Sequence, residues 1–81
     1  MNAEVKITAS EMRVLRALDA APDKIADASE LRRSANLTLR GFRTVAWRME
    51  DRRLIGRSQN RNYTLTFAGM MALKEAAQVS A

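Results

Sequence analysis

The segment Leu37–Arg53 constrains this chain most, because only one side of it can be buried in a core. At about 100° per residue on a helix, Val45, Ala46 and Met49 fall within about 60° of Phe42 and form an apolar face with it. The other side is polar and basic apart from one tryptophan, and carries Arg40, Arg43, Thr44, Trp47 and Arg48. Such a helix needs a core for one face and a polar partner for the other, so we expect the rest of the chain to present the basic face.

The net charge of +5 is concentrated around this segment. Residues 30–61 hold nine arginines and three acidic residues, whereas the rest of the chain has five basic and six acidic residues. Eleven of the fourteen basic residues are arginine, whose forked guanidinium suits contacts to phosphate and guanine. A merely solvated surface would show mixed signs and more lysine. The charge pattern therefore favours a nucleic acid as the partner.

The composition argues against several other classes of protein. There is no cysteine and no histidine, so the sequence offers no disulfide, no thiol nucleophile and no histidine base or metal ligand. It also lacks a phosphate-binding glycine loop, and we expect no enzyme activity, no metal and no cofactor. Charged residues interrupt the first twenty positions, which predicts neither a signal peptide nor a membrane span but a cytoplasmic protein. A length of 81 residues predicts a single domain, 1–81.

Helix-capping signals divide the chain into four predicted helices. The expected N-cap residues are Thr8, Asp27, Thr38 and Thr66. The first two are followed three positions later by glutamate, as in a capping box. They predict helices over about 8–19, 27–35, 38–53 and from 66 onwards. In the last helix, Met70, Leu73 and Ala77 are expected to face the core.

Two short strands and a turn are predicted after the basic helix. Residues 54–58 and 63–65 alternate apolar and polar side chains around the Asn-rich segment 59–62, which indicates a β-hairpin. Residues 24–26 are expected to add a short strand. The predicted order is helix, strand, helix, helix, strand, strand, helix. This order is mainly α with a small β-hairpin, and its two central helices form a helix-turn-helix.

The segment Arg48–Arg57, followed by Tyr63–Gly69, resembles the winged helix-turn-helix domain of MarR-like transcriptional regulators. In that family a recognition helix ends in an acidic and basic run, then Leu-Ile, a hairpin and a Leu-Thr-x-x-Gly helix start. The resemblance covers about 7–77. It implies that helix 38–53 lies in the DNA major groove and that hairpin 54–65 is a wing on the minor groove or backbone.

Two departures from the family limit what the resemblance implies. Arg53 stands where the family often has glycine, and a left-handed conformation there would cost on the order of 1 kcal/mol. MarR-like regulators usually carry extra helices for a dimer and an effector pocket, and 81 residues leave no room for them. Ligand sensing and a small-molecule effector pocket are therefore not expected.

The residues predicted to contact DNA lie on the helix-turn-helix and the wing. They are Arg32, Arg33, Thr38, Leu39, Arg40, Arg43, Thr44, Trp47, Arg48, Arg57 and Arg61. Arg40 and Arg43 are near the start of their helix, where recognition helices read bases. Arg61, at the hairpin tip, can enter a narrow minor groove. Leu39 is either a thymine-methyl contact or an edge of the core, and Trp47 is either partial core, a DNA contact or a partner contact.

A homodimer is a further expectation. Phe67 and Met71 lie about 60–100° from the inward row of the last helix. With Met1 or Val5 of the N-terminal arm they would form a second apolar face, unless the arm simply covers them. The favoured function is a sequence-specific, double-stranded DNA-binding regulator that works by occupying an operator, as a repressor does. The alternatives are a protein-interaction winged helix and a nonspecific architectural nucleic-acid binder.

Overall fold

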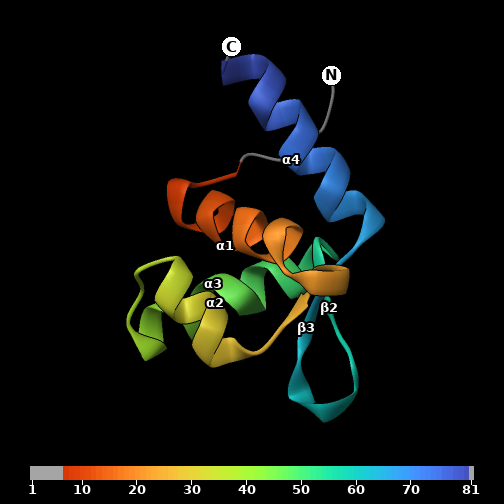
Figure 1. Ribbon diagram of the computed structural model, residues 1–81. Coiled ribbons are helices and arrows are strands. Elements are labelled where there is room, and N and C mark those ends of the chain that lie inside the picture. Colours follow the sequence, from red (N-terminus) through yellow and green to blue (C-terminus); the bar gives the residue numbers. More distant parts are fainter. Residues whose placement is uncertain (1–6, 81) are drawn as a thin grey trace.

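Four helices and a three-stranded antiparallel sheet form the part of the chain described by the computed structural model, residues 7–80 with side chains as far as residue 77 (Figure 1). The elements are α1 (Ala9–Ala20), β1 (Ile25–Ala26), α2 (Ala28–Ser34), α3 (Leu39–Asp51), β2 (Ile55–Arg57), β3 (Tyr63–Leu65) and α4 (Phe67–Ser80). Single 3₁₀ turns, η1 (Pro22–Lys24) and η2 (Gln59–Arg61), precede β1 and β3. The predicted winged helix-turn-helix order is confirmed.

The predicted N-caps explain where the helices begin. Thr8 accepts a hydrogen bond from the Glu11 amide at 3.2 Å, and the Glu11 carboxylate accepts one from the Thr8 amide at 3.0 Å. This reciprocal pair satisfies amides that the first turn of α1 cannot bond internally. The side chains of Asp27 and Thr38 cap α2 and α3 by accepting from the amide three residues later, at 2.8 and 3.0 Å.

The sheet order is β1-β3-β2, so β3 is the central strand. β3 pairs with β1 through Ile25 and Thr64, and with β2 through Arg57 and Tyr63. At the far end of the β2–β3 hairpin, two consecutive residues of η2 are left-handed: Asn60 has φ 64° and Arg61 has φ 63°. A turn of this kind matches the right-handed twist of a hairpin. The hairpin projects away from the helices as the wing (Figure 1).

The inner face of α3 supplies the centre of the core. Phe42, Ala46 and Met49 are buried, as their spacing predicts, against buried leucines of α1 and α2. Tyr63 of β3 packs edge-on against Phe42, with ring centroids 5.6 Å apart and an interplanar angle of 83°. α3 is therefore fixed on its apolar side by both the helices and the wing.

The end of α3 turns through a left-handed residue. Arg53 has φ 62°, its amide donates to Glu50 at 2.9 Å, and the Leu54 amide donates to Met49 at 2.9 Å. These paired bonds form a Schellman motif, in which glycine is the usual left-handed residue. The left-handed conformation considered for Arg53 is therefore present. Asn36, with φ 56°, ends α2 in the same way.

Thr66 joins the end of α3, the wing and α4. Its hydroxyl lies within hydrogen-bonding distance of the Arg53 carbonyl (2.7 Å) and the Leu54 carbonyl (2.9 Å). The same oxygen accepts from the Gly69 amide at 2.9 Å, which caps α4. Gly69 is buried against this joint, and a Cβ there would fall on the Leu54 carbonyl and 2.8 Å from Leu65 Cδ1. The close approach explains why glycine stands in the Leu-Thr-x-x-Gly pattern.

The inward row predicted for α4 is only partly correct. Met70 and Leu73 are partly buried and pack against the core, whereas Ala77 is exposed. Among the described residues, the core contact of α4 therefore ends before Ala77, although the helical spacing continues. The N-terminal arm, with Met1 and Val5, lies outside the described residues.

Candidate nucleic-acid interface

The outward face of α3 is exposed along its whole length. Arg40, Arg43 and Arg48 are exposed, and no hydrogen bond or ion pair involving their side chains is found within residues 7–77. Leu39 and Trp47 are 54% and 68% exposed. Neither is an edge of the core, and the wing does not cover Trp47. A basic surface with two apolar side chains is thus presented opposite the buried face.

The first turn of α3 combines several features suited to a polyanion. Thr38 caps it, and the turn contains no acidic residue. Because the helix dipole places partial positive charge at this end, it adds to the charge of Arg40 and Arg43. The Thr44 hydroxyl donates to the Arg40 carbonyl at 3.2 Å, so its oxygen can still accept a hydrogen bond. This end of α3 can therefore supply both forked and single hydrogen bonds.

The two arginines of α2 differ in their surroundings. Arg33 is exposed, whereas Arg32 is partly buried and donates from Nη1 to the Leu37 carbonyl at 3.3 Å. Arg32 thus stabilises the turn between α2 and α3. Arg33 is the one whose guanidinium is open to a phosphate.

The two wing arginines also differ. Arg61 is exposed at the hairpin tip. Arg57 donates from Nε to the Glu50 carboxylate at 3.3 Å, and its guanidinium lies 4.6 Å from the centre of the Tyr63 ring. Burial raises the pKa of the Tyr63 phenol, and the nearby Arg57 cation opposes this rise. The roles of Glu50 and Tyr63 beside Arg57 were not predicted, because their contact depends on the angle between α3 and the wing.

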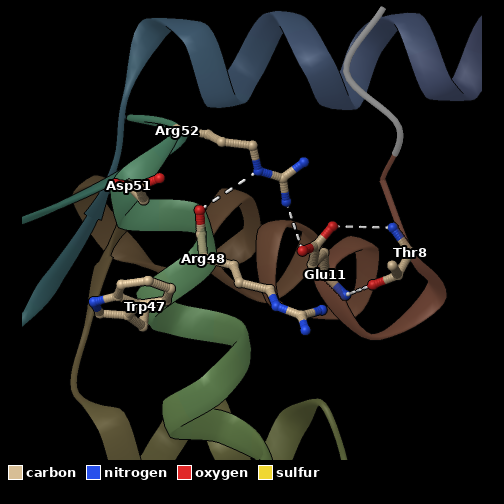
Figure 2. A pocket seen from close by; sticks show the side chains of 6 residues that line it. All are labelled: Thr8, Glu11, Trp47, Arg48, Asp51 and Arg52. Carbon is tan, nitrogen blue, oxygen red and sulfur yellow. Dashed lines mark hydrogen bonds and ion pairs between the residues drawn. The ribbon is translucent and has the colours of Figure 1, made fainter.

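A shallow depression of about 320 Å³ lies between the start of α1 and the second half of α3 (Figure 2). It is lined by Thr8, Glu11, Trp47, Arg48, Asp51 and Arg52. Both carboxylate oxygens of Glu11 are already bonded, one to the Thr8 amide and one to Arg52 at 2.6 Å. The buried acid that lines the depression is thus fully bonded within the protein.

Two further properties concern the described residues alone. They contain no group of three or more carboxylate, histidine or cysteine side chains that could hold a metal ion. No helix among them is long and apolar enough to cross a membrane.

The chain is similar to known proteins in structure, whereas the two sequence comparisons find no match. No protein-family model matches the chain, and no curated protein does. One similar solved structure is Bordetella bronchiseptica BpsR, from work on the regulation of its DNA binding by 6-hydroxynicotinic acid. The TM-score is 0.82 at 24% identity, over 96% of this chain and 58% of that one.

Lactococcus lactis ZitR is also similar, with a TM-score of 0.78 at 18% identity over 95% of this chain and 53% of that one. The chain thus spans little more than half the length of each of these MarR-family regulators. The likeness covers nearly all of this chain, from α1 through the wing to α4. The chain therefore has the winged helix-turn-helix fold found in MarR-like regulators.

Proposed function

We propose that this chain is a sequence-specific regulator that binds double-stranded DNA, with α3 in the major groove and the wing on the adjacent minor groove or backbone. One observation carries the proposal. Arg40 and Arg43 stand exposed in the first two turns of a helix whose opposite face, including Phe42 at 1% exposure, is fixed in the core. A recognition helix reads bases with this end, and rigid backing keeps its register on the duplex.

The exposed residues divide by the kind of contact they can make. Arg40 and Arg43 are one helical turn apart, so one guanidinium can fork onto guanine while the other meets a phosphate. Thr38, Leu39 and Thr44 flank them and can contact base edges or a thymine methyl group. Arg33 from the preceding helix would meet a phosphate of the same duplex.

The more distant contacts would position the protein rather than read sequence. Trp47 and Arg48 are in the third turn of α3, roughly 12 Å along the axis from its first residue. They would lie over the sugar-phosphate backbone at the edge of the groove. Arg61 would enter the minor groove, whose potential is most negative where it is narrow.

Binding to duplexes selected from a random pool, measured between about 50 and 200 mM salt, tests this function. Phosphate contact predicts that log affinity falls linearly with log salt concentration. Arg40→Gln should reduce discrimination between selected and unrelated duplexes, whereas Arg61→Gln should weaken both alike. Arg16→Gln, a change of equal charge on an exposed residue of α1, is the matched control and should do neither. The function is wrong if no duplex binds at moderate salt.

Dimerisation through α4 is also proposed. Phe67 is 74% exposed and Met71 is 41% exposed, one helical turn apart on the same side of α4. Two copies of such a patch can pair around a twofold axis and place two α3 helices on successive half-sites. Sedimentation of the wild type beside Met71→Glu tests this, with Ala77→Glu as a control elsewhere on α4. A wild type that sediments as a monomer, unchanged by either substitution, contradicts it.

A further inference from the structure

Arg57 is held between two residues of the protein itself. Its Nε lies 3.3 Å from the Glu50 carboxylate at the end of α3, and its guanidinium lies 4.6 Å from the Tyr63 ring centre in β3. Arg57 and Tyr63 face each other across the β2–β3 pairing. A single side chain therefore connects both strands of the wing to the recognition helix.

Tyr63 provides a second contact between the wing and α3. Tyr63 packs edge-on against Phe42, with ring centroids 5.6 Å apart. Phe42 and Glu50 are eight residues apart on α3, which corresponds to about 12 Å along the helix axis. The wing is thus attached to α3 at two separated points, and such an arrangement fixes an angle as well as a position.

Arg57 and Arg61 consequently present different surfaces to a polyanion. Arg61 is at the wing tip, and its side chain has no ion pair or hydrogen bond within the described part of the chain. A phosphate approaching Arg57 would meet the Glu50 carboxylate on the same guanidinium, and like charges repel. To bond a phosphate fully, Arg57 would have to leave its partner on α3.

We propose that Arg57 is a positioning residue, which with Glu50 and Tyr63 sets the angle between wing and recognition helix so that Arg61 reaches the DNA. The inference rests on the proposed DNA-binding function. It assigns to Glu50, an acidic residue in a basic surface, a role that favours DNA binding. Arg57 acts on the duplex only through the placement of the wing.

The test uses salt titrations against a selected duplex. Three variants, Arg57→Gln, Glu50→Gln and the double variant that combines these two changes, are compared with Arg61→Gln. Exposed ion pairs are weak, so each of the first two changes should lower affinity only about two- to five-fold. The double variant should be no weaker than Arg57→Gln alone. Arg57→Gln should leave the slope of log affinity against log salt unchanged, whereas Arg61→Gln should reduce it by about one.

Glu50→Gln is the most informative variant. The two hypotheses for Arg57, phosphate contact and positioning of the wing, predict opposite changes in its affinity for DNA. If Arg57 contacts phosphate, removing the neighbouring negative charge strengthens binding. If Arg57 positions the wing, the same change weakens binding. Stronger binding by Glu50→Gln, or a reduction of the Arg57→Gln slope by about one, overturns the proposal.

A measurement without DNA separates this inference from the proposed function. Residual dipolar couplings of the β2 and β3 amides, measured against those of α3 in the free protein, report the wing angle. Arg57→Gln and Glu50→Gln should change this angle in the same direction, and Arg61→Gln should not. Unchanged angles refute the positioning role even if DNA binding is normal. A wild type that binds no duplex refutes the function, while the angles still decide the role of Arg57.

Discussion

The Glu11 carboxylate lies 2.6 Å from the Arg52 guanidinium, although the two residues are 41 positions apart. The Glu11 side chain is 3% exposed and also completes the capping box of α1. One buried acid thus fixes both the start of α1 and the end of α3 (Figure 2). Its removal should affect the stability of the whole domain.

Glu11→Ala is expected to lower the free energy of unfolding by about 2–3 kcal/mol, because it breaks a half-buried ion pair and a helix cap together. Urea unfolding monitored by circular dichroism measures the loss. Glu30→Ala is the matched control, since Glu30 occupies the same position in α2 but is exposed. Its change should stay within about 0.5 kcal/mol. Equal losses in the two variants would contradict the importance of the Arg52 pair.

Arg53→Gly should stabilise the protein. Arg53 is left-handed with φ 62°, and glycine adopts this conformation without the clash that a Cβ causes. After allowing for the greater flexibility of glycine in the unfolded chain, we expect a gain of about 0.5–1 kcal/mol. Thermal unfolding checks this, with Arg16→Gly in α1 as a control that should lose about 1 kcal/mol. A loss at position 53 would show that its side chain makes a stabilising contact.

Gly69→Ala should destabilise the joint between the wing and α4. The added Cβ would fall on the Leu54 carbonyl, a backbone atom that cannot rotate away. Overpacking of this kind typically costs about 1–3 kcal/mol. In Gly41→Ala the nearest atom is Thr38 Oγ1 at 3.1 Å, and alanine's helix preference offsets part of the strain. Guanidinium unfolding of both variants tests the contrast, which fails if Gly41→Ala loses as much.

Stability should fall at alkaline pH through Tyr63. Burial raises the pKa of its phenol in the folded protein, with opposition from Arg57 and Arg43 and support from Glu50. The neutral form is therefore favoured by folding. The contribution is complete below the unfolded pKa, near 10, and is lost as pH rises through the folded pKa.

Tyr63 is the only tyrosine, so the absorbance of tyrosinate follows it alone. Urea unfolding across the same pH range should show a smaller alkaline loss for Tyr63→Phe than for the wild type, because phenylalanine does not titrate. Lysine titration is common to both proteins and cancels in the difference. Identical pH profiles would mean that the phenol titrates alike in the folded and unfolded states.

Trp47→Ala should separate binding from stability. Trp47 is 68% exposed, so its loss should change the free energy of unfolding by at most about 0.5 kcal/mol. The affinity of the Trp47→Ala variant for a selected duplex should nevertheless fall. In the wild type, the fluorescence of Trp47, the sole tryptophan, should change when DNA is added. A variant with full affinity, together with unaltered fluorescence, would remove Trp47 from the interface.

Local signals predicted most of the fold. The N-caps at Thr8, Asp27 and Thr38, the hairpin, and the buried face of α3 all depend on residues within a few positions of one another. The misplaced Ala77 shows the limit, since helical spacing identifies a face but not where the partner surface ends. In the candidate site, too, local features could be predicted and contacts between distant residues could not. Exposure of the α3 arginines was foreseeable, but the Glu11–Arg52 pair required the fold.

The hydroxyl of Thr66 has a consequence for how distant parts of the molecule can influence one another. Its oxygen bonds both to the Arg53 carbonyl, just after the end of α3, and to the Gly69 amide in the first turn of α4. The N-terminal end of α4 is thus bonded to the base of the wing. A tilt of α4 would therefore be transmitted at this joint to the turn that connects α3 with the wing.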